Sequence, residues 1–497
     1  MLPAKEGVSV AETKTVESRV PARIDRLPFS RWHWLVIAAL GITWILDGLE
    51  VTMVGNIASV LTDPKSGLGL SGGQVGTAGG LYIAGACAGA LFFSYLTDKF
   101  GRKKLFLITL GVYLIFTIAT AFSWNFLSFV VFRFLTGAGI GGEYSAIYSA
   151  IDELIPARIR GRVALAISGT YWAGAALGSL VAVFLLNAAF LSLFYSWRIA
   201  FLVGAVLGIC VLLIRRYVPE SPRWLATHGR NEKAEQVTGG IEERVKEYTD
   251  TEELPQVDEE ETITIEQRKS IGFTPILRAM FQMYPKRTVL GLVLMGTQAF
   301  LYNAVLFTYG LILSSYYGVP GENVGYYIAV LAIGNLTGPL LLGRFFDRVG
   351  RVPMISGCYV TSGVLLGVSG YLFHQQVLTG TTLTAIWVAM FFFASSAASA
   401  AYLTVSEVFP MEIRAMAIAL FYAIATGIGG ITGPIVFGQL IGTGNRSNLL
   451  IGFGIAAGLM IAAAVAELVL GVRAEQRSLE DVATPLTAIQ EETGASA

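Results

Sequence analysis

Four ionisable residues stand out inside long apolar segments, where a charged side chain is costly. Asp47 and Glu50 lie in the apolar run that begins near residue 34, and Arg133 and Glu143 lie in the run at 126–150. An ionised group in hydrocarbon costs about 2.5–3.5 kcal/mol on insertion scales, so each needs a partner or a water-filled cavity. Asp47 and Glu50 are three residues apart and therefore share one helix face.

We expect this acidic face to meet Arg133 across a cavity, because the two segments place these residues at similar depths. The guanidinium favours the charged form of one carboxyl, whereas the second acid and burial favour the neutral form of the other. Asp47, Glu50 and Arg133 are therefore a candidate proton-coupling group. The alternative is a static ion pair that holds two helices together. Glu143 lies deeper in its segment, and we expect it to pair with a basic residue near the inner end.

Polar and aromatic side chains in the other apolar segments could bind a small solute. The two amides are favoured because a buried amide needs hydrogen-bond partners. Aromatic residues in such segments often serve packing instead. The candidates are Trp44, Tyr171, Trp172, Gln298, Tyr302, Asn303, Tyr309, Tyr402 and Tyr422.

Other kinds of chemistry find no support in the sequence. The glycines at 137–142 fit a dinucleotide-binding pattern, but they lie inside an apolar segment, where close helix packing explains them. The three cysteines and three histidines lack the spacing of metal ligands. We expect no metal, no cofactor and no enzyme activity.

The composition indicates that these residues are positioned by membrane-spanning helices. Charged residues make up only 14% of the 497 residues, against about 25% in soluble proteins, and the net charge is zero. These values exclude a soluble enzyme and a nucleic-acid binder. A span needs about 20 apolar residues, and twelve runs qualify: 34–59, 77–97, 104–123, 126–150, 162–186, 198–217, 288–314, 323–343, 352–373, 382–405, 414–441 and 449–472.

The distribution of basic residues predicts the orientation of these spans. With the N-terminus inside, the short cytoplasmic loops carry eleven Lys and Arg residues and the opposite loops carry three. We therefore expect a multi-pass protein of the plasma (inner) membrane with both termini in the cytoplasm. The predicted segments are an N-terminal tail (1–33), a six-helix bundle (34–217), a central loop (218–287), a second six-helix bundle (288–472) and a C-terminal tail (473–497).

Two polar motifs recur in the second half of the chain. An Asp-x-x-Gly-Arg motif repeats 249 residues later, and a Glu-x-x-Pro-x-x-x-Arg motif repeats 254 residues later. Such a repeat is typical of transporters built from pseudo-symmetric halves. The motif residues are Asp98, Gly101, Arg102, Glu153 and Arg160 in the first half, and Asp347, Gly350, Arg351, Glu407 and Arg414 in the second.

These motifs resemble the major facilitator superfamily, and the resemblance covers about residues 34–472. The family's loop motif, Gly-x3-Asp-x2-Gly-Arg, is complete from Gly343 in the second half, whereas Ser94 replaces its first glycine in the first half. Arg133-x3-Gly137-x3-Gly141 and the segment 219–224 (Pro-Glu-Ser-Pro-Arg-Trp) resemble the sugar-porter and organic-ion branches. Asp47-Gly48-Leu49-Glu50 resembles the span-one motif of aromatic-acid:proton symporters, one group of metabolite:proton symporters.

The resemblance implies an all-α membrane protein with twelve transmembrane helices in two pseudo-symmetric six-helix bundles around one central cavity. It also implies that the charged motif residues form ion pairs between helix ends that close the cytoplasmic side, a gate to which we add Glu143. The basic members of these motifs also contribute to the positive-inside bias, which is a second explanation for them.

The function expected on these grounds is secondary active transport of a small organic solute by alternating access. We favour proton symport of an organic acid or related metabolite, because Arg133 could receive a carboxylate. Proton-coupled export and sugar transport are alternatives. Span seven lacks the Gln-rich glucose-binding pattern of the family, which disfavours a sugar. A non-transporting sensor with the same fold is the alternative from another class. The expected partners are the solute, protons and the lipid bilayer, with no nucleic acid, and we expect a monomer.

Overall fold

Twelve long apolar helices dominate the computed structural model of the chain. It describes residues 15–100, 102–187, 191–215, 219–227, 229–251, 253–256, 263–266, 277–409 and 420–473. Within these ranges twelve helices are long and apolar enough to cross a membrane. They are α2 (Arg31–Thr62), α3 (Gly72–Phe100), α4 (Arg102–Ala121), α5 (Phe126–Leu154), α6 (Ala157–Leu186), α7 (Leu193–Arg215), α11 (Pro285–Tyr317), α12 (Val324–Arg348), α13 (Arg351–His374), α14 (Gly380–Glu407), α16 (Gly427–Gly442) with the π-helical turn η5 (Tyr422–Thr426) before it, and α17 (Arg446–Leu470).

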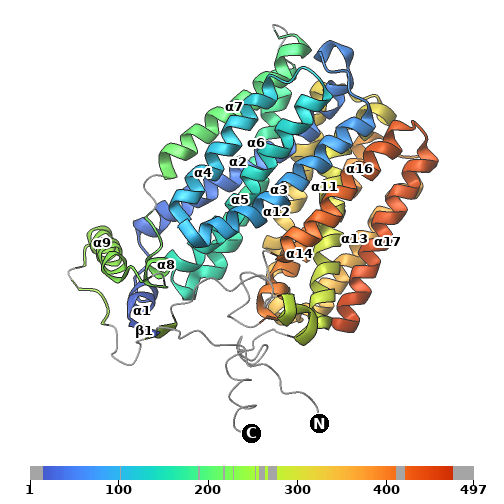
Figure 1. Ribbon diagram of the computed structural model, residues 1–497. Helices are drawn as coiled ribbons and strands as arrows, with labels where there is room; N and C mark the ends of the chain where they lie inside the picture. Colours follow the sequence, from blue (N-terminus) through green and yellow to red (C-terminus); the bar gives the residue numbers. More distant parts are fainter. Residues whose placement is uncertain are drawn as a thin grey trace, which may run out of the picture.

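The helices form two bundles with the same internal packing, as Figure 1 shows. In the first bundle α2 packs on α6, α3 on α5 and α4 on α7. In the second bundle the corresponding pairs are α11 with α16, α12 with α14 and α13 with α17. The predicted fold class is thus confirmed. The boundaries predicted for the tails, bundles and loop stay predictions.

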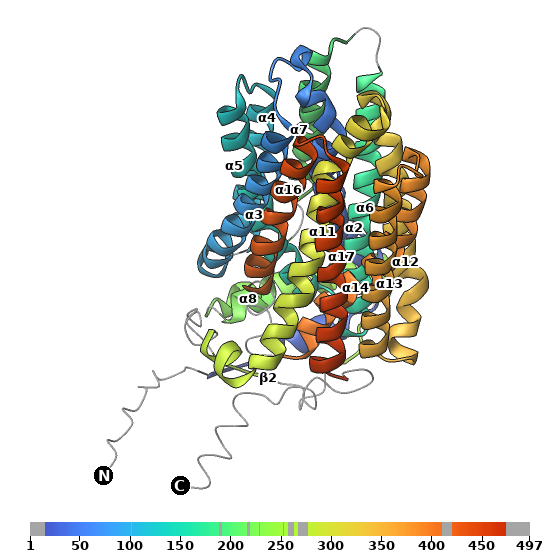
Figure 2. The same cartoon turned by 90° about the vertical axis from the view of Figure 1, so that its right-hand side faces the viewer.

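The two bundles touch mainly through three helix pairs: α2 with α11, α3 with α16, and α6 with α12 (Figure 2). We call the side where α2 begins and α17 ends the tail side, and the opposite side the far side. Several close backbone approaches between the bundles lie toward the far side. A Cβ built on Gly76 would lie 2.3 Å from the carbonyl oxygen of Pro434, and one on Gly325 would lie 2.3 Å from that of Ser179. Only glycine permits these contacts, so they close the far side.

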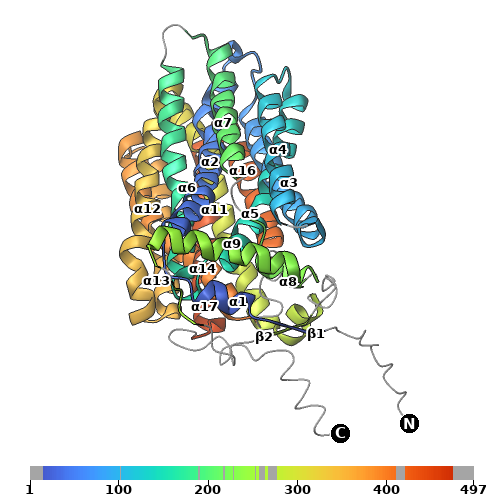
Figure 3. The same ribbon diagram turned by 90° about the vertical axis from the view of Figure 1, so that its left-hand side faces the viewer.

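A small cap on the tail side joins the N-terminal tail to the central loop (Figure 3). It contains α1 (Val20–Asp25), α8 (Pro222–Thr227), α9 (Asn231–Thr249) and an antiparallel ribbon of β1 (Thr15–Ser18) and β2 (Ile263–Glu266). Val20 of α1 is buried against Trp224 and Leu225 of α8. The described part of the central loop therefore contains helices and packs with the tail, a contact that sequence patterns did not predict.

Charged residues clamp α1 to α9 within this cap. Arg23 donates hydrogen bonds to both carboxylate oxygens of Glu242, at 2.9 Å from Nε and 2.6 Å from Nη2. Arg26 donates a third hydrogen bond to the same carboxylate, from its Nη2 at 2.7 Å. Burial alone would raise the pKa of Glu242, but the hydrogen bonds from Arg23 and Arg26 outweigh it, so the pKa lies below its ordinary value. The clamp is therefore complete at neutral pH and is lost only as pH falls through this depressed pKa.

We predict that Gly76→Leu opens the far side. Overpacking against the Pro434 carbonyl costs about 1–3 kcal/mol, which shifts a two-state equilibrium about 5–150-fold. A reporter cysteine at Ser59 (Ser59→Cys), in a background without native cysteines, should react correspondingly faster with a membrane-impermeant thiol reagent. Gly111→Leu is the matched control, because no atom lies within 4 Å of a Cβ at Gly111. Equal labelling rates in both variants would refute the far-side closure.

We also predict that Glu242→Gln releases α1 from the cap. Loss of the charged hydrogen bonds costs about 2 kcal/mol, so amides of α1 should exchange with deuterium about 30-fold faster at neutral pH. Glu243→Gln is the control, because Glu243 is exposed on the same helix. In the unmodified protein the same acceleration should require acid, at a pH below the usual titration range of a glutamate. Unchanged exchange in Glu242→Gln would show that the clamp is unimportant.

Candidate functional site

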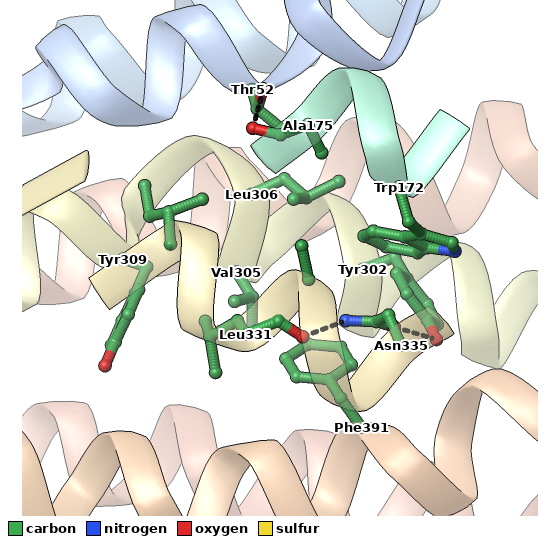
Figure 4. Close-up of a pocket in the computed structure, with 12 residues that line it drawn as sticks. Thr52, Trp172, Ala175, Tyr302, Val305, Leu306, Tyr309, Leu331, Asn335 and Phe391 are labelled. Atoms are coloured by element: carbon green, nitrogen blue, oxygen red, sulfur yellow. Dashed lines mark hydrogen bonds between the residues drawn. The ribbon is translucent and has the colours of Figure 1, made fainter. Parts of the chain in front are cut away.

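A hollow lies between the two bundles and is the candidate binding site (Figure 4). Residues from five helices line it, two in the first bundle and three in the second. Most of its wall is apolar or aromatic. The lining residues are Thr52 of α2; Trp172 and Ala175 of α6; Tyr302, Val305, Leu306 and Tyr309 of α11; Ile328, Leu331, Ala332 and Asn335 of α12; and Phe391 of α14.

One amide group supplies most of the polarity of this hollow. Asn335 accepts a hydrogen bond from the Tyr302 hydroxyl at 2.8 Å and donates one to the Leu331 carbonyl at 3.1 Å. The Ser395 hydroxyl donates a hydrogen bond to the Asn335 backbone carbonyl at 2.8 Å. An amide offers two N–H donors and two acceptor lone pairs. One N–H and one lone pair of the Asn335 amide take no part in these two hydrogen bonds.

Aromatic rings from both bundles meet around the same hollow. The ring of Trp172 lies 5.6 Å from that of Tyr302, and Tyr302 lies 5.1 Å from Phe391. The ring of Tyr309 lies 4.8 Å from that of Trp387 at a tilt of 31°, and its hydroxyl shares a 2.5 Å hydrogen bond with Thr384. Such walls offer faces and edges to a planar ring.

Three of the nine solute-binding candidates line the hollow: Trp172, Tyr302 and Tyr309. Trp44 and Tyr171 pack behind the lining residue Trp172. The ring centroids of Tyr171 and Trp172 are 5.0 Å apart, and those of Trp44 and Tyr171 are 6.2 Å apart. The other four candidates do not line this hollow: Gln298, Asn303, Tyr402 and Tyr422. Asn303 instead donates to the Ala299 carbonyl of its own helix at 2.8 Å. Their part in solute binding stays a prediction.

The sequence analysis did not select Thr52, Asn335 or Phe391. Asn335 carried a usable signal, because it is an amide in an apolar span, the same argument that selected Gln298 and Asn303. Phe391 carried none, since it is one of many phenylalanines in the spans.

The expected contact between the acidic face of span one and Arg133 is made by Glu50. The two side chains form an ion pair and are 0% and 1% exposed. Arg133 also lies 4.1 Å from the Tyr82 ring centroid and 5.5 Å from that of Phe201. Neither residue lines the hollow described above, and the cavity expected beside the pair stays a prediction. The pair joins α2 to α5 inside the first bundle.

Asp47 has a different environment from Glu50. It is buried and interacts electrostatically with Tyr82 of α3, Tyr171 of α6 and Tyr422 of η5. Its neighbour Gly48 lets α2 approach α6 closely, since a Cβ there would lie 2.0 Å from the Tyr171 carbonyl oxygen. Asp47 is therefore within electrostatic range of tyrosines in both bundles, whereas the ion pair of Glu50 lies within one.

The structure describes only part of the predicted gate. Gly350 has φ of 105°, a conformation that favours glycine, and Arg351 is buried at the start of α13. Glu143 is buried on α5. The gate itself stays a prediction, because the other members, or their side chains, lie outside the described residues: Asp98, Gly101, Arg102, Glu153, Arg160, Asp347, Glu407 and Arg414.

No group of three His, Cys, Asp or Glu side chains in the described part of the chain could hold a metal ion. His33 has a local contact, since its Nδ1 accepts from the Ser30 backbone N–H at 3.1 Å. The hollow can bind a solute through aromatic rings and hydrogen bonds, and the acid Asp47 lies nearby.

Comparison with known proteins places the whole membrane region in one family. A family model described as sugar (and other) transporter matches residues 34–485. The niacin transporter NiaP of Acinetobacter baylyi is 26% identical over 463 residues, covering 93% of this chain and 99% of that protein. The 4-hydroxybenzoate transporter PcaK of the same organism is 26% identical over 484 residues, covering 95% and 98%.

A solved structure with the same fold is the inward-open conformation of the xylose transporter XylE from Escherichia coli. It matches with a TM-score of 0.67 and 21% identity, covering 91% of this chain and 98% of that one. At this identity the likeness concerns the fold.

Proposed function

This chain belongs to the sugar (and other) transporter family of the major facilitator superfamily, and on that premise we propose that it carries a small aromatic acid across the membrane together with a proton. The chain is a multi-pass membrane transporter with twelve spans and not an enzyme. The observation that carries the proposal is the aromatic hollow between the bundles, with Asn335 held in its wall.

The proposed substrate class follows from the wall of the hollow. Trp172, Tyr302 and Phe391 offer ring contacts, and Asn335 offers one donor and one acceptor. A sugar needs many hydrogen bonds, but the Tyr302 and Tyr309 hydroxyls are already engaged. The relatives named for niacin and 4-hydroxybenzoate, both one-ring aromatic acids, support the same class.

The proposed orientation puts the tail side in the cytoplasm of a cell bounded by the plasma membrane. The excess of Lys and Arg in the short loops on this side supports the assignment. Both termini are then cytoplasmic, and the closed far side makes this an inward-facing conformation. Alternating access requires the three far-side helix contacts to separate while the tail-side ends approach.

Within the proton-coupling group Asp47, Glu50 and Arg133, we assign the exchanged proton to Asp47. Arg133 compensates the charge of Glu50 inside the first bundle. Asp47 faces tyrosines of both bundles, so a movement between the bundles changes its surroundings. A changing environment is what allows an acid to bind a proton on one side and release it on the other.

We predict that Asn335→Leu weakens binding of 4-hydroxybenzoate or nicotinate about tenfold. A lost hydrogen bond costs about 0.5–1.5 kcal/mol, and the purified protein can be titrated by calorimetry. Thr337→Val is the matched control on the same helix, because the Thr337 hydroxyl donates to the Ile333 carbonyl at 2.8 Å and does not line the hollow. Binding of xylose but of neither acid would overturn the proposed substrate class.

We also predict that Asp47→Asn abolishes proton-driven accumulation in proteoliposomes but spares exchange of labelled for unlabelled substrate. The amide cannot carry a proton, yet it keeps the size and polarity of the acid. Asp63→Asn, in the far-side loop after α2, should behave as the unmodified protein. Accumulation against a gradient by Asp47→Asn contradicts the assignment, and absence of exchange in the unmodified protein points to a sensor rather than a carrier.

A further inference from the structure

The last turn of α17 holds an acid that has no part in the proton-coupling group. Glu467 is fully buried, and neither of its carboxylate oxygens has a hydrogen-bond partner among the described residues. The sequence analysis counted residues 449–472 as a plain apolar span and did not select it. A buried acid without partners in the final helix therefore needs an explanation.

Three physical factors disfavour a charge on Glu467 in this conformation. The carboxyl is removed from water, and no described donor compensates for that loss. It also lies at the C-terminal end of α17, where the helix dipole is negative and repels an anion. Glu467 is therefore a neutral carboxylic acid here and holds a proton.

The carboxyl lies beside the first turn of α13. A Cβ built on Gly471 would be 2.9 Å from the Glu467 carboxyl and 2.9 Å from the side chain of Val352, so both border the same small space. Val352 follows Arg351, the buried arginine of the repeated gate motif. The N-terminal end of α13 is the positive end of its helix dipole, so it attracts a carboxylate.

Few other titratable groups of the packed helices face this region in the described part of the chain. Tyr359 of α13 interacts electrostatically with Glu467 and donates its hydroxyl to the Leu294 carbonyl of α11 at 3.0 Å. Arg287 of α11 donates to the Val408 carbonyl at 2.6 Å. The remaining titratable groups on the tail-side portions of α11, α13 and the segment after α17 are Lys286, Cys358 and Arg473, and α16 carries none.

We propose that Glu467 is a proton-operated positioning residue of the tail-side gate. Protonated, it stabilises the present conformation with the far side closed. When the first turn of α13 turns toward it, the carboxyl O–H bond breaks, the proton leaves to the tail-side solution, and the carboxylate pairs with the Arg351 guanidinium. This inference rests on the proposed transport cycle, but it concerns the conformational equilibrium and not the coupled proton of Asp47.

A distance measurement across the tail side tests this proposal without substrate or gradient. Spin labels at Lys104→Cys and Val349→Cys, in a background without native cysteines, report the separation of the bundle ends in lipid nanodiscs. The population with separated ends should fall as pH rises from about 5 to about 9, by at most about tenfold per pH unit for one proton. Glu467→Gln should keep the ends apart and remove this pH dependence.

Several controls make the result decisive. Glu467→Leu replaces the acid by an apolar side chain that suits a buried site, so it serves if the glutamine variant folds poorly, and it should also be independent of pH. Glu322→Gln, in the far-side turn Gly321–Asn323, should keep the pH response. So should Asp47→Asn, which separates this inference from the proposed proton coupling. An unmodified pH response in either Glu467 variant, or no response in the unmodified protein, overturns the proposal.

Discussion

Backbone-to-backbone contact between the bundles is the constraint on which the rest of the structure depends. In lipid there is no hydrophobic effect to press apolar helices together, so association relies on close packing and on hydrogen bonds. Gly76 against Pro434 and Gly325 against Ser179 provide this packing on the far side. Because α2, α3, α6, α11, α12 and α16 meet there, the hollow between the bundles is closed on that side, and its aromatic wall is assembled from both of them.

The buried acids illustrate how surroundings decide what a carboxyl can do. Glu50 has a cation beside it and is enclosed by one bundle, so its environment stays the same when the bundles move as rigid bodies. Asp47 faces tyrosines from both bundles, and Glu467 lies between two helix ends of opposite polarity. A charge-bearing group can respond to a conformational change only if that change alters what it touches. This criterion separates a structural acid from one that exchanges a proton.

Hydropathy and internal repetition were sufficient to predict the spans and their grouping in two bundles, and the depths of the ionisable residues predicted that the acidic face of span one meets Arg133. They were insufficient for the site, because most spans are apolar on every face and hydropathy does not reveal which face turns toward the other bundle. Tyr302 and Asn303 are adjacent, yet Tyr302 lines the hollow and Asn303 bonds to its own helix. Glu467 was missed because one acid barely alters the average hydropathy of a span. The contact of the tail with the loop depends on pairing between segments far apart in sequence, which no local pattern encodes.

The clamp in the tail-side cap has a consequence for the order in which the protein assembles. Arg23 precedes Glu242 by 219 residues, so the ribosome completes the whole first bundle before the partner of α1 exists. At a synthesis rate of about 5–20 residues per second, α1 is made roughly 10–40 s before its partner Glu242. During that interval α1 is accessible to chaperones, and afterwards it is docked on α9, so the cap forms only once the nascent chain has nearly reached its midpoint.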